Sequence, residues 1–175
     1  MREAIYPLAL GVLSSPLPRV VVAPARWKEY DAIPGNHPRE WSERFSIERA
    51  HFLGAYAVGR RVGGAVVIVD GTDAVRLGGA AGLGLLWDLR VALDVRGAGI
   101  GRALLGAAER SARQAGMGGM VIETQNTNVA ACELYARAGY GVTKVDATAY
   151  PDLPGEVQVV WTKIWQQGAA HHAAY

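Results

Sequence analysis

The run Arg96-Gly97-Ala98-Gly99-Ile100-Gly101 stands between an apolar, strand-like segment at residues 83–93 and an amphipathic stretch at residues 100–115. Glycines let the backbone turn tightly and approach a ligand closely. The free N–H groups of a first helical turn, together with the helix dipole, favour an anion. The sequence therefore predicts a loop that binds phosphate where a strand passes into a helix.

Two other kinds of glycine-rich loop are excluded by the residues at the end of this run. A Walker loop ends in Gly-Lys-Ser/Thr, whereas Arg102 and Ala103 follow Gly101 here. A dinucleotide-binding G-x-G-x-x-G loop would need glycine at position 102 or 104, where Arg102 and Leu104 stand. A different phosphate-containing ligand is therefore expected.

Length and composition bound the class of protein. The chain has 175 residues, of which 50% are hydrophobic, which predicts one domain at residues 1–165 with a loose tail at 166–175. A net charge of +2 on scattered Lys and Arg predicts no nucleic-acid partner. No segment approaches the about 18 continuous apolar residues of a membrane helix, and the opening segment lacks the features of a signal peptide. A cytoplasmic protein without a membrane partner is expected.

The cysteine and histidine residues predict no metal site. Cys132 is the single cysteine, and the four histidines do not fall at metal-ligand spacings. Cys132 could in principle carry an acyl group, but no histidine lies near it in sequence. A cysteine at a small-residue helix position is expected to serve packing.

The apolar pattern predicts an α/β (α+β) fold, with a mixed, mostly antiparallel sheet flanked by helices. Residues 51–58 and 62–69 form a hairpin around a turn at 59–61, and residues 83–93 form a third strand. Residues 27–41 are expected to form a loop and helix that cover the substrate. Further strands are expected at 19–23, 120–124, 142–146 and 156–165.

Two helices are expected beside this sheet. Residues 100–115 place apolar side chains at helical spacing, with Gly116 as the C-terminal cap. Asn126 or Asn128 caps a second helix, which runs to Ala138 and ends at Gly139. The buried positions of the first helix are Ile100, Leu104, Leu105, Ala108, Ala112 and Ala115.

The glycine run and the segment after it carry a family resemblance. Arg-Gly-x-Gly-Ile-Gly after a strand ending in Val91 resembles the acyl-coenzyme A loop of the GCN5-related N-acetyltransferase (GNAT) superfamily. Residues 123–140 resemble the second cofactor segment of that superfamily, and the resemblance covers roughly residues 84–165. A narrower pattern is similar to streptothricin N-acetyltransferases: Glu123-Thr124-Gln125, Asn128, Ala131-Cys132, Tyr135-Ala136, Val145-Asp146 and Tyr150.

The resemblance implies a GNAT fold and an N-acetyltransferase that uses acetyl-CoA. The acetyl group would pass by direct attack in a ternary complex to a primary amine of a small cationic acceptor, such as a streptothricin-like antibiotic. Antibiotic resistance and a homodimer are compatible with it. Acetylation of lysine, a polyamine or a peptide N-terminus is an alternative, as is a noncatalytic acetyl-CoA-binding module.

The resemblance also implies which residues hold the cofactor. Backbone groups of the strand from Leu89 to Val91 would contact the pantetheine arm and the thioester carbonyl. Asn128 would lie on the face of the second helix that meets the cofactor. Residues of the loop would hold the pyrophosphate by backbone amides and positive charge, namely Arg96, Gly97, Ala98, Gly99, Gly101 and Arg102.

Tyr135 is the candidate general acid. A phenol with a reference pKa of about 10 can protonate a leaving thiolate whose thiol has a pKa of about 8.5. From periodicity alone an ordinary core tyrosine is an even alternative, and the resemblance favours the catalytic role. About two helical turns separate Tyr135 from Asn128, so the two share a face.

Carboxylates are the candidates for accepting a proton from the acceptor amine. Asp88 lies between apolar residues, where a carboxylate needs a partner or a role, and an ion pair is the structural alternative. Trp87 occupies a place where many relatives carry Glu. Glu123 is the second candidate, although it could pair with an arginine. Asp146 and Tyr150 are expected to bind the cationic acceptor.

Overall fold

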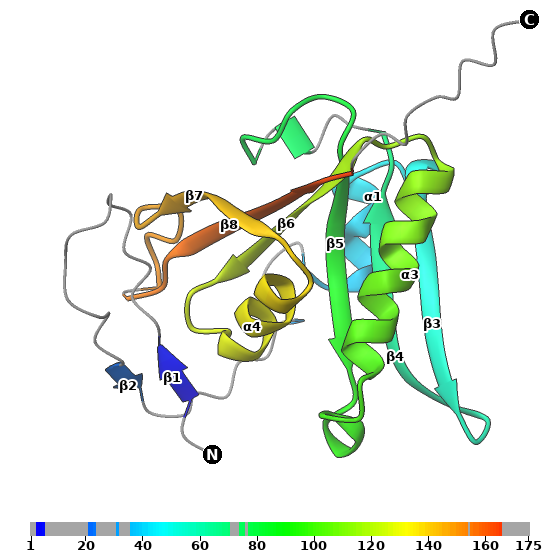
Figure 1. The fold of residues 1–175 in the computed structure, drawn as a ribbon, viewed down its shortest axis with the longest axis horizontal. Coiled ribbons are helices and arrows are strands. Elements are labelled where there is room, and N and C mark those ends of the chain that lie inside the picture. Colours follow the sequence, from blue (N-terminus) through cyan, green and yellow to red (C-terminus); the bar gives the residue numbers. More distant parts are fainter. Residues whose placement is uncertain are drawn as a thin grey trace, which may run out of the picture. The chain divides into compact units, whose positions relative to one another are not determined.

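The computed structural model describes residues 3–5, 21–23, 31, 36–70, 74–75, 77–153 and 155–165, and the first two ranges as backbone only (Figure 1). The chain divides into two compact units. The first unit comprises Met1–Ser46 and Glu123–Trp161, and the second comprises Ile47–Ile122 and Thr162–Tyr175. The prediction of a single domain at 1–165 stays a prediction, and the tail at 166–175 lies outside the described residues.

The described strands confirm the predicted mixed sheet. Six strands follow the order β3-β4-β5-β6-β8-β7. β3 (Ala50–Ala57), β4 (Arg60–Ile68) and β5 (Gly84–Val91) pair antiparallel, whereas β5 and β6 (Gly119–Gln125) pair parallel through Gly84–Leu86 and Met120–Ile122. A separate pair joins β1 (Glu3–Ile5) and β2 (Val21–Ala23), so part of the strand expected at 19–23 is present.

The second unit packs α3 (Ile100–Gln114) against β3, β4 and β5. The amphipathic pattern of residues 100–115 explains this arrangement, because the residues at helical spacing are the buried ones. Gly116 ends the helix with φ +81°, and Gly116 N–H donates to Arg113 while Met117 N–H donates to Ala112. The helix therefore begins at Ile100 as predicted and ends at Gln114, one residue before the predicted end. Leu104, Leu105, Ala108 and Ala112 are buried as predicted, whereas Ile100 and Ala115 are half-buried.

The hairpin turn differs from the predicted one. Val58 and Gly59 form it with φ of 48° and 73°, and β4 begins at Arg60. A two-residue turn with two positive φ angles matches the twist of a hairpin. The sequence placed Val58 in the strand because a β-branched residue rarely takes a positive φ. The predicted turn, 59–61, therefore begins one residue later in the chain than the observed turn, 58–59.

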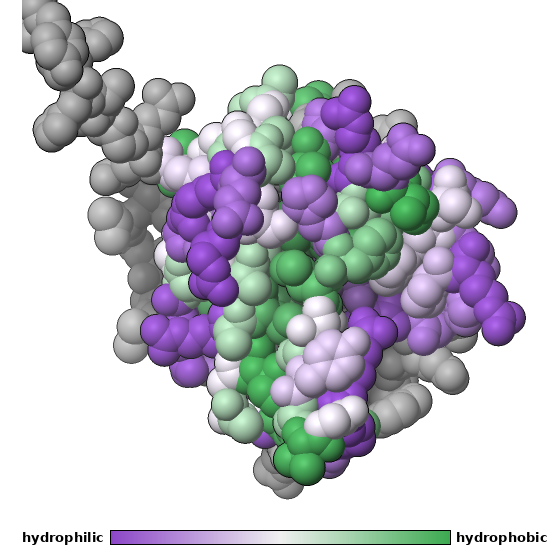
Figure 2. Space-filling model, turned by 90° about the vertical axis from the view of Figure 1, so that its right-hand side faces the viewer, coloured by the Kyte–Doolittle hydropathy of each residue, from purple (hydrophilic) through white to green (hydrophobic). Residues whose placement is uncertain are grey.

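Exposure along β3 alternates, as expected for a strand covered on one face. His51 points to α3, where its Nδ1 lies 2.7 Å from Ser111 Oγ. Phe52 and Tyr56 are exposed, and Val58 follows at the turn. In Figure 2, apolar residues appear in a band between hydrophilic ones.

The first unit contains 3-10 helix η2 (Pro38–Glu40), α1 (Trp41–Arg44), α4 (Val129–Arg137), β7 (Gly141–Asp146) and most of β8 (Gln158–Ile164). Asn128 caps α4 through a hydrogen bond from Ala131 N–H, 3.3 Å. This confirms one of the two predicted caps. The helical elements at 38–44 agree with a helix in the region 27–41, of which residues 27–30 and 32–35 lie outside the described part.

Candidate active site

The glycine-rich loop starts α3 with left-handed backbone. Gly97 and Gly99 have φ of 82° and 81°, and Gly99 is the N-cap. The first bond of the helix runs from Ala103 N–H to the Gly99 carbonyl, 3.0 Å, so the amides of residues 100–102 precede the helical hydrogen-bond ladder. Gly101 lies inside the helix, so the positions that require glycine for backbone conformation are 97 and 99.

The surroundings of this loop fit an anionic ligand. A Cβ built on Gly97 or Gly99 would meet nothing within 4 Å, so open space adjoins the backbone. Arg96 and Arg102 are both exposed at the loop, and Arg96 Nε donates to the Val91 carbonyl, 3.2 Å. That bond fixes an arginine to the end of β5. The arrangement combines helical amides with positive charge, which is the chemistry of a phosphate site.

Gly63 of β4 lets α3 approach the sheet. A Cβ there would lie 2.8 Å from the Arg90 carbonyl and 3.0 Å from Leu104 Cδ1. No side chain fits in such a space, so the close packing of the first turns of α3 depends on this glycine. Sequence reasoning missed Gly63, whose only local signal is a glycine inside a strand pattern.

A bulge interrupts the pairing of β4 with β5. Val66 pairs with Asp88 while Val67 pairs with Leu86, which leaves Trp87 as the extra residue. Bulges redirect the side chains that follow them. After the bulge, Leu89, Arg90 and Val91 pair with Ala65, Gly64 and Gly63 of β4.

Asp88 forms an ion pair on β5. Arg90 Nε lies 2.7 Å from Asp88 Oδ1, and the two side chains share one face of the strand. The structure thus contains the salt bridge that was the alternative to a catalytic role for Asp88. Arg90 was missed, although its i, i+2 spacing from Asp88 on a strand is a usable signal.

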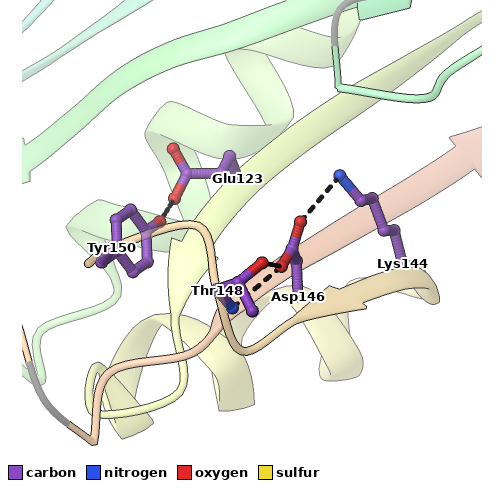
Figure 3. A network of polar contacts seen from close by, with 5 residues as sticks. All are labelled: Glu123, Lys144, Asp146, Thr148 and Tyr150. Atoms are coloured by element: carbon purple, nitrogen blue, oxygen red, sulfur yellow. Dashed lines mark hydrogen bonds and ion pairs between the residues drawn. The ribbon is translucent and has the colours of Figure 1, made fainter.

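In the first unit, β6 brings together Glu123, Gln125 and Tyr150. Glu123 and Gln125 point to the same face because side chains alternate along a strand. The Tyr150 hydroxyl donates to Glu123 Oε1 (Figure 3). It accepts from Gln125 Nε2 at 3.3 Å. Glu123 and Tyr150, predicted separately, are therefore in direct contact. Gln125 was quoted in the motif but not assigned a role.

The loop that carries Tyr150 is held at both ends. Leu153 N–H donates to the Tyr150 carbonyl, 3.0 Å. Further along, Asn126 Oδ1 accepts from Val157 N–H, 2.8 Å, and Asn126 N–H donates to the Val157 carbonyl, 2.9 Å. Asn126 was considered as a helix cap, and it instead joins the end of β6 to the start of β8.

Asp146 ends β7 in a local polar network. Its Oδ1 accepts from Thr148 N–H, 2.9 Å, and from Thr148 Oγ1, 2.7 Å, and Lys144 Nζ lies 3.3 Å from Oδ2 (Figure 3). The hydrogen bonds from Thr148, followed by Lys144, lower the pKa of Asp146 below its usual value. Asp146 is therefore an ionised group whose carboxylate already has internal donors.

Tyr135 is a buried residue of α4. Tyr140 N–H donates to the Tyr135 carbonyl, 3.1 Å, and Gly139 N–H donates to Ala136, 3.0 Å, in a helix end closed by Gly139 with φ +84°. The Tyr135 ring lies 6.2 Å from the rings of Tyr140 and of Trp161. This is the packing of a core tyrosine, and the role of Tyr135 as an acid stays a prediction.

Cys132 is partly buried on α4. Burial raises the pKa of its thiol to about 11, and its Sγ lies 3.8 Å from the Gln125 carbonyl. A thiol with such a pKa is a poor nucleophile at neutral pH. This agrees with the expectation that Cys132 serves packing.

The described residues contain no group of three or more His, Cys, Asp or Glu that could hold a metal ion. Within the same residues, no helix is long and apolar enough to cross a membrane.

The mixed sheet and the glycine-capped helix define an α/β protein whose first helical turn has the chemistry of a phosphate site. The sequence pattern of the Acetyltransferase (GNAT) family matches residues 20–140. That match spans more than half of the chain and includes residues of both units. The chain therefore belongs to the Acetyltransferase (GNAT) family.

The similarity to curated relatives covers about half of the chain. Streptothricin acetyltransferase A of Bacillus subtilis (strain 168) is 35% identical over 82 residues, which are 46% of this chain and 47% of that protein. Streptothricin acetyltransferase of Escherichia coli is 33% identical over 81 residues, 45% of each chain. The chain spans about half the length of the curated relatives it matches.

Solved structures share the fold. A protein of Bacillus anthracis str. Ames, assigned as a streptothricin acetyltransferase and solved with acetyl coenzyme A, has a TM-score of 0.71 at 23% identity. The match covers 94% of this chain and 84% of that one. Nourseothricin acetyltransferase has a TM-score of 0.62 at 22% identity, with coverage of 94% and 86%. At these identities the likeness concerns the fold.

Proposed function

We propose that the protein transfers acetyl from acetyl-CoA to a primary amine of a small cationic acceptor of the streptothricin type. The observation that carries the proposal is the start of α3, where left-handed Gly97 and Gly99 precede the helical amides. Family membership and the names of the curated relatives support the choice of reaction and acceptor.

The candidate residues would contribute different parts of the chemistry. In the second unit, the amides after Gly99 and the guanidinium of Arg102 would bind the pyrophosphate, with Arg96 adding charge beside them. Backbone groups of Leu89 and Val91 would hold the pantetheine arm, and Asn128 is a further candidate for a polar contact with the cofactor. When bound, acetyl-CoA supplies an acetyl group activated as a thioester.

Two side chains of the first unit would move protons. Glu123 takes one proton from the acceptor's ammonium group, and the neutral nitrogen then forms a bond to the carbonyl carbon as the carbon–sulfur bond breaks. Tyr135 gives a proton to the leaving thiolate and regains one from the nitrogen, which becomes an amide. The proton on Glu123 is released to solvent, so charge and atoms balance.

Among the carboxylates, Glu123 is the better candidate for the base. Arg90 already forms a close ion pair with Asp88, and a carboxylate beside a positive charge is a weaker base. Asp146 and Tyr150 lie in the segment expected to bind the acceptor. A homodimer and a cytoplasmic location remain predictions.

A panel of acceptors tests this proposal. The protein would be mixed with acetyl-CoA and streptothricin, lysine, a polyamine, a peptide N-terminus or a neutral aryl amine, and free thiol would be measured. Rapid thiol release with cationic amines, and fastest with streptothricin, is expected. Tight acetyl-CoA binding without thiol release from any amine would show a noncatalytic binding module instead.

A further inference from the structure

The contact between Tyr150 and Glu123 assigns Tyr150 a task other than direct substrate binding. Its hydroxyl oxygen has two neighbours on β6, the carboxylate of Glu123 and the amide nitrogen of Gln125. Because these neighbours occupy alternate positions on one strand, both hydrogen bonds come from a single rigid element. The phenol is thereby held by two hydrogen bonds to the same strand.

The direction of the hydrogen bond follows from the chemistry of the partners. An ionised carboxylate only accepts, so the phenol donates to Glu123. Burial, and then the charge of Glu123, raise the pKa of Tyr150 above that of an ordinary phenol, so the proton stays on Tyr150 at neutral pH. Gln125 Nε2 supplies the donor that the phenol oxygen accepts.

The three candidate carboxylates differ in the charge of their partners. Asp88 is paired with the guanidinium of Arg90, and Asp146 with the ammonium of Lys144. Each of those pairs has no net charge. The phenol of Tyr150 is neutral, so its hydrogen bond leaves the negative charge of the Glu123 carboxylate in place, and a negative charge attracts an ammonium group.

We propose that Tyr150 is a positioning residue for acetyl transfer, whose phenol fixes the Glu123 carboxylate that receives the acceptor's ammonium group. This inference rests on the proposed function and adds the means by which Glu123 is oriented. Two hydrogen bonds between Asn126 and Val157, together with the turn from Tyr150 to Leu153, hold the loop so that the phenol reaches β6. The hydrogen bond from Tyr150 to Glu123 then restricts the orientation of the carboxylate.

A double-mutant cycle tests the inference. Tyr150→Phe keeps the ring and removes the hydroxyl, while Glu123→Gln keeps the shape and removes the charge. We expect Tyr150→Phe to lower kcat/KM for streptothricin about 10-fold and Glu123→Gln to lower it about 100-fold or more. The double variant should fall within about twofold of Glu123→Gln, because Tyr150 acts through the carboxylate.

Two readouts separate positioning from a general structural role. KM for acetyl-CoA should stay the same in all variants, and the urea midpoint of Tyr150→Phe should shift little more than that of the control. The control is Tyr140→Phe, which removes a hydroxyl from another tyrosine of the same unit. Its kcat/KM should remain that of the wild type.

The contradicting results are distinct from those that would refute the proposed function. If the two losses multiply in the double variant, or if Tyr150→Phe has wild-type activity, Tyr150 does not position Glu123 and only this inference fails. If the wild-type protein transfers no acetyl group to any amine, the proposed function fails, and the positioning role fails with it.

Discussion

Gly99 determines how α3 begins. Its left-handed φ of 81° costs an L-residue about 1–2 kcal/mol, because Cβ approaches the following carbonyl. Gly99→Ala should therefore destabilise the protein by about that amount and weaken acetyl-CoA binding. Urea unfolding and calorimetry measure the two effects. Gly106→Ala is the matched control, because Gly106 lies inside α3 and this change should stabilise the helix by up to about 1 kcal/mol. Equal acetyl-CoA affinity in Gly99→Ala and the wild type would contradict the phosphate-loop interpretation.

Tyr135 combines core packing with a proposed chemical role. Tyr135→Phe retains the ring contacts with Tyr140 and Trp161. It should lower turnover by about 10²–10⁴, the range for general acid catalysis, and leave acetyl-CoA affinity unchanged. Steady-state kinetics at saturating substrates, across pH, measures the loss. Wild-type turnover in this variant would show that Tyr135 serves packing and is not the general acid.

Cys132 gives a test of burial that does not depend on activity. Its thiol pKa is raised from 9.0 to about 11, so at pH 8 the folded protein holds far less thiolate than the unfolded chain. Alkylation by iodoacetamide at pH 8 should be slower in the folded state on the order of 100-fold, and the rate should rise with pH toward about 11. Because the chain has one cysteine, the rate reports this residue alone. Similar rates in buffer and in urea would show that the thiol is not buried.

At the scale of elements, the packing of α3 on β4 is sensitive to one position. A methyl group at Gly63 would meet the Arg90 carbonyl at 2.8 Å, a backbone atom that cannot turn away. Gly63→Ala should cost about 1–3 kcal/mol and also weaken acetyl-CoA binding by displacing the start of the helix. Gly84→Ala is the control, since its nearest neighbour would be Ala112 Cβ at an ordinary 3.4 Å. Equal unfolding midpoints for the two variants would argue against this role of Gly63.

The same elements show what local sequence can and cannot predict. The start of α3 at Ile100, the left-handed Gly116 that follows its last turn and the cap at Asn128 follow from glycine and asparagine chemistry that acts within a few residues. The turn at Val58 did not follow, because tertiary pairing of β3 with β4 overrides the backbone preference of valine.

The candidate site shows the same limit more clearly. Glu123 and Tyr150 could be chosen as candidate site residues from the sequence. Their hydrogen bond could not be predicted, because it joins segments far apart in the chain. No periodicity or cap connects such positions. The ion pair of Asp88 with Arg90 could have been predicted, since alternation along β5 places both side chains on one face.

At the scale of the whole molecule, we expect a stoichiometric transfer rather than binding or hydrolysis. One acceptor amine should gain one acetyl group for each thiol released, because Glu123 and Tyr135 balance the protons and the amine nitrogen captures the acyl carbon. Streptothricin incubated with acetyl-CoA and the protein would be analysed by mass spectrometry while free thiol is measured in the same sample. We expect about one monoacetylated streptothricin for each thiol released. Thiol without acetylated product, or bound acetyl-CoA with neither, would contradict it.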